Sequence, residues 1–337
     1  MAISLKKWCK YSLSAAAVTS TLAFASYGAY AQLIKAAGAS FPEILFERYS
    51  TAYEEETGAE FEYKVIGSGG GIRKFVEESI NIGSTTLVPT PIERNQVEDG
   101  MLMIPTAGGA VAVVYNLQDV TTDVRLSREK LAQIFTGEIS NWRQVNPRLP
   151  NREIQVVVRS DDSGTTFILT KYLRQITNGK VAARRNSNWD FDIFAERPQD
   201  SGVAAEVRRI DGAIGYVQAS YALQNNLPVA RLQNLAGNYV NPTVEETKKA
   251  LGELEFNEDL TTTQISDPAT GYPLVGLTWL LIYKNYPNQD LLDSTQDFIT
   301  WVLTRGQEFN EELNYTKIPE DVAERALETI NNELEVR

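Results

Sequence analysis

Short apolar runs alternate with amphipathic segments along the chain from residue 33 onward. The apolar runs are bounded by turn-forming residues, which is typical of buried strands. The segments between them carry apolar residues three and four positions apart, which predicts helices. Strands are predicted at 33–37, 60–66, 80–83, 101–105, 109–115, 154–159, 213–217 and 271–284. Helices are predicted at 43–56, 72–78, 127–135, 167–175, 203–209, 219–224, 243–251, 290–304 and 319–333.

This alternation indicates an α/β protein with mostly parallel sheets. A chain of 337 residues is long enough for two domains, each with its own core. The pattern changes near residue 115, and the long apolar strand at 271–284 has the length to pass back between two lobes. We therefore expect a discontinuous first lobe formed by 32–114 plus 275–337 and a second lobe formed by 115–274.

Residues 1–31 have the pattern of a cleaved secretory signal peptide. Three lysines precede a short apolar core at 13–25, and 29–31 form the small-x-small pattern of a cleavage site that would leave Gln32 as the N-terminus. The core is too short and too rich in Ala and Ser for a stable membrane span. Cys9 lies before this core, whereas a lipid-anchored cysteine would follow it.

Composition excludes several classes of function. Loss of the three signal-peptide lysines takes the formal charge from −12 to −15, so a nucleic-acid partner is not expected. The chain has no histidine, and its single cysteine lies in the signal peptide. Ser-His-Asp and Cys-His catalysis, disulfides and the common zinc sites are thereby excluded. We expect no cofactor and no bound metal.

The most informative stretch is 154–167, where a β-branched run ends on Arg159, passes through a polar turn and enters an apolar helix. This order points the backbone N–H groups and the positive end of a helix dipole at one spot. Arg159 adds a cation with five donors, and Ser163 and Thr165 add hydroxyl groups. An oxyanion is the ligand that suits such a group of donors.

Two other strand ends carry similar chemistry. In 38–42, Ser40 is positioned as an N-cap before a proline in the first helical turn. In 67–71, four glycines allow a backbone to approach a ligand closely. No Gly-Lys-Ser/Thr follows, and Ile72 replaces the third glycine of a dinucleotide fingerprint.

Each of these features also has a purely structural interpretation. Ser40 and Ser68 are suited to serve only as helix caps, since capping and anion binding use the same donor geometry. The loop from Arg159 to Thr165 is also compatible with a capped helix and a surface ion pair. Asp161 and the residue after it are not suited to hold a metal together, because neighbouring side chains in an extended turn point apart.

Five motifs in a fixed order carry a resemblance to a known family. The chain resembles the periplasmic phosphate-binding proteins of high-affinity phosphate ABC transporters, through residues 38–42, 66–72, 159–165, 212–217 and 272–283. Residues 137–142 are similar to a further landmark of the family. The resemblance implies a two-lobed type II periplasmic-binding-protein fold with phosphate in the interlobe cleft. It also implies a periplasmic monomer whose partners are a membrane permease and its ATPase.

The resemblance assigns ligand roles to particular residues. Ser40 and Phe41 correspond to ligands of the first loop, the former through its hydroxyl and amide and the latter through its amide. Ser68 corresponds to the serine of the glycine loop. The second-lobe ligands of the family correspond to Arg159, Ser163, Gly164 and Thr165. Asp161 is similar to the acidic residue that orients the binding arginine in this family.

One position departs from the family pattern. An aspartate that accepts a proton from bound phosphate usually follows the strand at 80–83, and Thr86 stands there in this chain. Fully ionised sulfate has no proton to donate, so an acceptor at this point rejects it. A threonine hydroxyl donates as well as accepts. We therefore expect a lower barrier against sulfate, unless Asp162, Thr85 or a neighbouring carboxylate replaces the missing acceptor.

The favoured function is high-affinity binding of inorganic phosphate for transport, without catalysis. A receptor for another tetrahedral oxyanion, such as sulfate, arsenate or a phosphate ester, is the alternative within the same fold. A secreted phosphatase that uses Ser163 is a remote alternative, because the chain offers no histidine base and no metal cluster.

Overall fold

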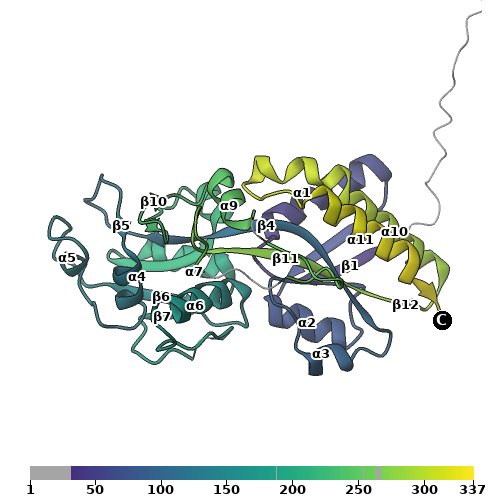
Figure 1. The fold of residues 1–337 in the computed structure, drawn as a ribbon, viewed down its shortest axis with the longest axis horizontal. Coiled ribbons are helices and arrows are strands. Elements are labelled where there is room, and N and C mark those ends of the chain that lie inside the picture. The colour runs from purple at the N-terminus through teal and green to yellow at the C-terminus, as the bar shows by residue number, and fades with distance from the viewer. Residues whose placement is uncertain (1–31, 187, 253, 263–266) are drawn as a thin grey trace, which may run out of the picture.

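The computed structural model describes residues 32–186, 188–252, 254–262 and 267–337, so the predicted signal peptide lies outside it. No helix within these ranges is long and apolar enough to cross a bilayer. The molecule is elongated, with a group of helices and strands at each end and two long strands running between them (Figure 1).

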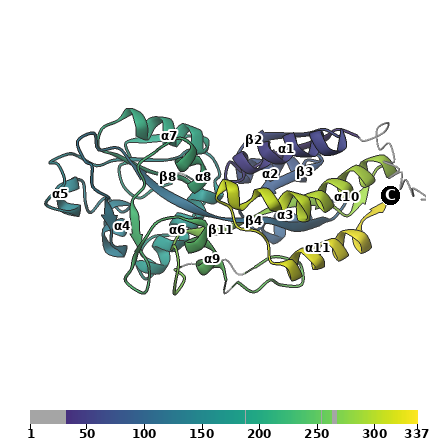
Figure 2. The same cartoon turned by 90° about the horizontal axis from the view of Figure 1, so that it is seen from above.

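The first half starts with three strand–helix units. They are β1 (Ile34–Gly38) with α1 (Glu43–Thr57), β2 (Phe61–Val65) with α2 (Ser68–Val76), and β3 (Ile82–Thr85) with α3 (Pro91–Asn95). The three strands are parallel, with β1 in the middle. From the end of the chain, α10 (Gln289–Leu303) and α11 (Glu320–Glu333) lie in this half (Figure 2). Two short 3-10 turns (Arg305–Phe309 and Glu311–Leu313) join these last two helices.

Strands β4 (Met101–Tyr115) and β11 (Val275–Tyr283) connect the two halves. Strand β4 pairs with β11 along Met101–Ala110 and with β8 along Val111–Tyr115. The sequence predicted two strands here, at 101–105 and 109–115, and this was wrong because the strand is continuous. A β-bulge allows the strand to continue through Pro105. The register with β11 shifts at this point, and a bulge leaves a backbone position unpaired, so the missing N–H of the proline costs no ladder hydrogen bond.

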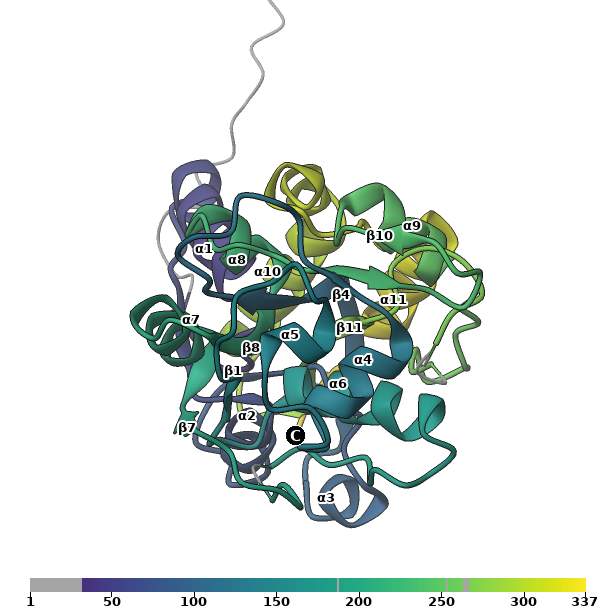
Figure 3. The ribbon, with the colours of Figure 1, turned by 90° about the vertical axis from the view of Figure 1, so that its left-hand side faces the viewer.

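The second half contains the other strands and helices of the middle of the chain. Its main strands are β6 (Gln155–Arg159), β7 (Ala195–Arg197) and β8 (Ala213–Gln218), which are parallel. Helices α4 (Arg128–Ile134) and α6 (Gly164–Ile176) lie on one side of β8, and α7 (Gln199–Arg209) lies on the other (Figure 3). The remaining elements are α5 (Trp142–Val145), α8 (Ala219–Gln224), α9 (Val244–Leu251), and short strands β5 (Arg125–Leu126), β9 (Arg231–Gln233) and β10 (Tyr239–Val240).

All the main strands belong to one sheet, in the order β2-β1-β3-β11-β4-β8-β6-β7. The outer strands on each side run parallel to their neighbours, while β11 and β4 in the middle pair antiparallel. A further pair, β12 (Asn285–Tyr286) and β13 (Glu335–Val336), ties the C-terminus to the first half. The α/β class and the mostly parallel pairing predicted from the sequence are confirmed.

Large aromatic side chains fill the core of each half. Trp142 is fully buried in the second half, and its Nε1–H donates to the carbonyl of Gly212 at 2.9 Å. Trp279 is fully buried in β11 and donates to the carbonyl of Leu260 at 3.1 Å. Tyr286 is buried as well, so the aromatic residues at 279–286 belong to the core, as the apolar pattern indicated.

Candidate functional site

Arg159 ends strand β6 and is almost fully buried, with 1% of its surface exposed. A buried guanidinium requires partners for its N–H groups. Its Nε and Nη2 groups donate to the two carboxylate oxygens of Asp161 at 2.7 and 2.5 Å. The Gln199 N–H donates to the same carboxylate at 3.1 Å. This bidentate pair sets the plane of the guanidinium and directs Nη1 toward other groups.

The Nη1 group of Arg159 lies between a hydroxyl and a second carboxylate. It is 3.4 Å from Thr165 Oγ1 and 3.2 Å from Asp200 Oδ1. Asp200, in the first turn of α7, is 0% exposed. Its other oxygen accepts a 2.7 Å hydrogen bond from Ser40 Oγ, which belongs to the opposite half of the molecule. Arg159, Asp200 and Ser40 thus form a buried bridge between the two halves.

Ser40 does not cap helix α1, so the capping interpretation was wrong. Pro42 occupies the N-cap position and no side chain caps the helix. Helix α1 begins only at Glu43, so Ser40 lies two residues before the N-cap position, and its hydroxyl donates instead to the buried carboxylate of Asp200.

Burial and ion pairing oppose each other in this cluster. Burial disfavours the charged forms of Arg159 and Asp161, but it is outweighed for Arg159 by the charge of Asp200 and the contacts with Asp161, and for Asp161 by the contacts with Arg159. The pKa of Arg159 is therefore raised and the pKa of Asp161 is lowered. For Asp200, burial has the largest effect and raises its pKa, although the charge of Arg159 and the Ser40 hydrogen bond lower it. One cation thus lies between two carboxylates in different environments.

The N-terminus of helix α6 contributes free backbone donors. Ser163 is its N-cap, and the Ser163 hydroxyl oxygen accepts from the Thr166 N–H at 3.2 Å. Within the described residues, no hydrogen bond uses the N–H groups of Gly164 or Thr165. These two groups and the helix dipole are directed at the turn that follows Arg159, and suit an anion.

Gly164 approaches the first half of the molecule more closely than any other residue type would allow. A Cβ atom at this position would lie 1.4 Å from Thr86 Oγ1 and 3.0 Å from Ser68 Oγ. These two hydroxyl oxygens are 3.2 Å apart, and Ser68 Oγ also accepts from the Thr86 N–H. The predicted ligands Gly164, Ser68 and Thr86 are thus brought together from the two halves.

The glycine run at 67–71 is part of a helix, although the sequence pattern placed the helix start at Ile72. Helix α2 begins at Ser68, with Gly67 at its N-cap position. The absence of a side chain at Gly71 permits this, because a Cβ atom there would lie 2.6 Å from the Ser84 carbonyl oxygen. The helix end is thereby packed directly against the ends of β1 and β3.

Phe41 joins the site through its backbone. Its side chain is fully buried against Tyr315, and the Phe41 carbonyl accepts from the Tyr315 hydroxyl at 2.7 Å. Among the described residues, its N–H group has no hydrogen-bond partner. The amide next to Ser40 is therefore a further available donor.

The two residues that were considered as substitute acceptors have other partners. Asp162 pairs with Arg73 at 3.4 Å, where both side chains are partly exposed, and its carbonyl accepts from the Gly69 N–H. Thr85 Oγ1 donates to the Leu87 carbonyl at 3.0 Å and accepts from the Leu87 N–H. Both are occupied in local contacts.

Sequence reasoning missed Asp200. We predicted an irregular segment up to residue 199 and the next helix from 201–203 onward, whereas α7 begins at Gln199. An acidic residue in a first helical turn usually indicates only a favourable dipole interaction. Its proximity to Arg159 depends on the pairing of β6 with β7 and was not visible in the pattern.

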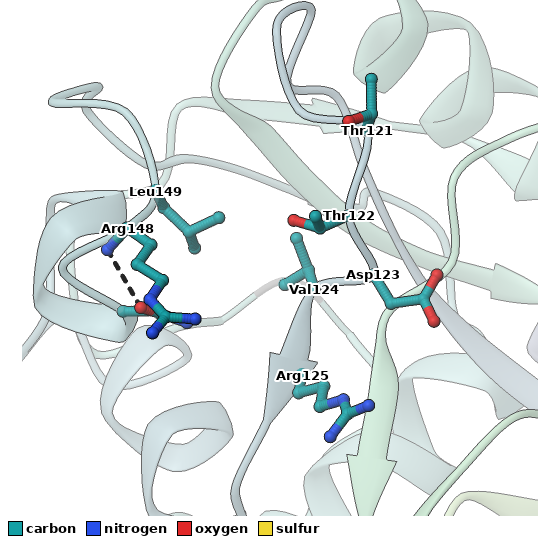
Figure 4. A pocket seen from close by; sticks show the side chains of 8 residues that line it. Thr121, Thr122, Asp123, Val124, Arg125, Arg148 and Leu149 are labelled. Atoms are coloured by element: carbon teal, nitrogen blue, oxygen red, sulfur yellow. Dashed lines mark hydrogen bonds between the residues drawn. The ribbon is translucent and has the colours of Figure 1, made fainter.

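A cavity elsewhere does not contribute to this site. It has a volume of about 620 Å³, lies in the second half and is open to solvent (Figure 4). It is lined by Thr121, Thr122, Asp123, Val124, Arg125, Asn146, Arg148 and Leu149, none of which belongs to the cluster around Arg159. Within the described part of the chain, no group of three or more acidic residues is placed to hold a metal ion.

A model of the PBP superfamily domain matches residues 14–305 of the chain. The phosphate-binding protein PstS of Haemophilus influenzae is 33% identical over 309 residues, covering 87% of this chain and 91% of the relative. The protein of the same name from Methanocaldococcus jannaschii is 33% identical over 337 residues, covering 89% and 86%. The similarity therefore extends over nearly the whole length of both proteins.

Solved structures share the fold. A high-affinity periplasmic phosphate-binding protein with bound phosphate superimposes with a TM-score of 0.76 at 19% identity, covering 90% of this chain and 99% of that chain. An ancestral soluble variant of the human phosphate-binding protein gives a TM-score of 0.77 at 20% identity, covering 91% and 100%. The type II periplasmic-binding-protein fold expected from the sequence is confirmed.

Proposed function

We propose that this chain, which belongs to the PBP superfamily and to its family of phosphate-binding proteins, binds inorganic phosphate and delivers it to an ABC transporter. The observation that carries the proposal is the cluster around Arg159. A buried guanidinium, held by Asp161, faces hydroxyl groups from both halves of the molecule. Such an arrangement suits a small tetrahedral anion better than an extended ligand.

The donors available to the anion come from three helix N-termini. In this proposal Arg159 Nη1, the Thr165 hydroxyl and the N–H groups of Gly164 and Thr165 bind from the second half. From the first half, the Phe41 N–H binds the anion, and the Ser40 hydroxyl turns its proton from Asp200 to the anion. Ser68, Thr86 and Ser163 add hydroxyl groups. Local dipoles must provide the attraction, since a protein with a net charge of −15 after cleavage repels anions at long range.

We further propose that 32–114 plus 275–337 and 115–274 move as two lobes about β4 and β11. The switch of β4 from β11 to β8 lies between Ala110 and Val111, a few residues before the proposed boundary. Contacts across the cleft, such as Ser40 with Asp200, would break on opening. Phosphate would bind the open form and be enclosed on closure.

The same proposal places the mature protein in the periplasm, as a monomer that docks on a membrane permease with its ATPase. It has no catalytic activity. Relatives that carry the name phosphate-binding protein support a binding role. The lack of histidine supports it independently, because the usual base near neutral pH is missing.

Titration calorimetry of the mature chain, residues 32–337, with inorganic phosphate tests the proposal. We expect tight 1:1 binding in the wild type. Arg159→Ala should weaken it by about 2–5 kcal/mol, because desolvated charge-assisted hydrogen bonds are lost. Wild-type affinity in the Arg159→Ala protein would refute the assignment of this site. Sustained release of product from a chromogenic phosphate ester would instead indicate a phosphatase.

A further inference from the structure

Asp200 is a carboxylate that contacts proposed anion donors from both halves of the molecule, and neither the family pattern nor the sequence analysis gave it a role. Its Oδ2 atom is 2.7 Å from Ser40 Oγ and its Oδ1 atom is 3.2 Å from Arg159 Nη1. Both of these donors belong to the proposed phosphate site. An anion that binds Ser40 and Arg159 must therefore lie against Asp200.

Two anionic oxygens that share the same donors repel each other unless a proton lies between them. Phosphate at neutral pH still carries at least one proton, and this proton can be donated to a carboxylate. Fully ionised sulfate carries none. With sulfate in the cleft, Asp200 would face an unprotonated oxygen inside a buried site, where an unpaired acceptor is costly.

We propose that Asp200 accepts the proton of the bound phosphate and thereby makes the site selective against fully ionised oxyanions. This inference rests on the proposed function, and it assigns to α7 the acceptor that the family places at the position of Thr86. No bond other than the hydrogen bond changes. The proton stays between a carboxylate oxygen of Asp200 and one phosphate oxygen.

The other carboxylates near the cleft do not suit this role. Both oxygens of Asp161 are taken by Arg159, and one also accepts from Gln199. Asp162 faces Arg73 at the rim. The charges of Asp200 and Arg159 act on Glu43, in the first turn of α1, but within the described residues no hydrogen bond or ion pair joins Glu43 to Arg159 or Ser40. Asp200 alone among these four bridges a cation and a hydroxyl of the proposed site.

The charge balance of the cluster supports the same conclusion. Arg159 is already paired with Asp161 and Asp200, so the three side chains carry a net charge of −1 when all are ionised. An unprotonated dianion in the same buried volume would add two further negative charges. A shared proton reduces that repulsion, and the raised pKa of Asp200 is consistent with a carboxylate that readily shares one.

The inference also predicts a dependence on pH in the wild type. Once protonated, Asp200 donates a hydrogen bond and no longer rejects sulfate, so sulfate affinity should rise as the pH falls. The ionisable groups that face Asp200 are Arg159 and Asp161 from the β6 end, Glu43 from α1, Tyr221 from α8 and Tyr315 near the C-terminus. The tyrosines stay neutral through this range, because burial raises their pKa values.

Calorimetry with phosphate and with sulfate at pH 8 tests the assignment in three proteins: wild type, Asp200→Asn and the matched control Asp162→Asn. The wild type should prefer phosphate strongly. Asp200→Asn should reduce the phosphate-to-sulfate affinity ratio by about tenfold to hundredfold, because an amide can donate to sulfate. The control should keep the wild-type ratio, since Asp162 faces Arg73 rather than the anion.

The outcomes separate this inference from the proposed function. Failure of the wild type to bind phosphate would overturn the proposed function. Phosphate binding with an unchanged ratio in Asp200→Asn, or an equal fall in both aspartate variants, would overturn the role of Asp200 alone. If Asp200→Asn does not fold, Asp200→Ser, which also removes the carboxylate, decides: an unchanged phosphate-to-sulfate ratio in this variant refutes the inference.

Discussion

Gly164→Ala offers a direct test of how closely the two halves approach in the bound state. Gly164 is the first residue of helix α6, where alanine is a good helix former. The added methyl group would nevertheless lie 1.4 Å from Thr86 Oγ1 and 2.6 Å from Thr86 Cβ. The substitution is therefore favourable for the helix and unfavourable only for contact across the cleft.

The size of the effect follows from these distances. Rotation of the Thr86 side chain can move Oγ1 away, but it cannot move Cβ. Ordinary contact between such atoms begins at 3.4 Å, so the backbones must separate by nearly 1 Å. Overpacking of this kind costs about 1–3 kcal/mol. Phosphate affinity should thus fall by about 5- to 150-fold, at 1.4 kcal/mol for each factor of ten.

The assay combines calorimetry with urea unfolding. We expect weaker phosphate binding and a free energy of unfolding within about 0.5 kcal/mol of the wild type, because no core contact is lost. Thr86→Gly, alone and combined with Gly164→Ala, completes a double-mutant cycle. Removal of Cβ together with Oγ1 should recover, in the double variant, part of the affinity that Gly164→Ala loses.

Three results would refute this reasoning. Wild-type affinity in Gly164→Ala would show that the bound state does not bring Gly164 against Thr86. A large loss of stability would show that the glycine matters for folding of the second half instead. Strict additivity in the cycle would mean that the two residues do not contact each other when phosphate is bound.

Two further predictions concern stability. Glu43→Gln should raise the free energy of unfolding at pH 8 but not at pH 4. Burial, followed by the charges of Asp200 and Glu47, raises the pKa of Glu43 to about 7, although the charge of Arg159 lowers it. The stabilising effect of protonated Glu43 is therefore present below pH 4.5 and is lost as the pH rises through 7. Because the side chain is partly exposed, urea unfolding at a series of pH values should show a difference of about 1–2 kcal/mol between the variant and the wild type at pH 8. A difference that does not depend on pH would contradict this prediction. Trp142→Phe should destabilise the protein by about 1–3 kcal/mol without changing phosphate affinity, since it removes buried volume and the donor to the Gly212 carbonyl. Denaturant titration measures the stability of Trp142→Phe, and calorimetry measures its phosphate affinity. A loss of affinity as large as the loss of stability would argue against a purely structural role for Trp142.

Local patterns were sufficient for most of the helices and strands. Ser127 and Thr243 cap α4 and α9 through their hydroxyl oxygens, as expected for these residue types at such positions. Helix α8 has the bounds that the pattern predicted. Such features depend on neighbours in the sequence, so the sequence pattern is enough to find them.

Errors arose where a distant contact overrides a local preference. Ser40 has every local feature of an N-cap, yet its hydroxyl donates to Asp200, 160 positions further along the chain. The glycines at 67–71 suggest a loop, yet packing against Ser84 stabilises them as a helical turn. The position of Asp200 itself depends on how β7 pairs with β6. Tertiary contacts of this kind leave no periodic signal in the sequence.

Contacts across the cleft link selectivity to closure. The halves meet where Ser40 donates to Asp200, the Gly69 N–H donates to the Asp162 carbonyl, Gln199 Nε2 donates to the Val65 carbonyl and Arg185 pairs with Glu93. Among these four, only the first joins groups that also face the proposed anion. A protonated anion satisfies Ser40 and Asp200 together and favours the closed form. An unprotonated anion repels Asp200 and therefore disfavours the closed form. Sulfate is thus rejected because the equilibrium between the two forms shifts toward the open one, and not because sulfate clashes inside a rigid pocket.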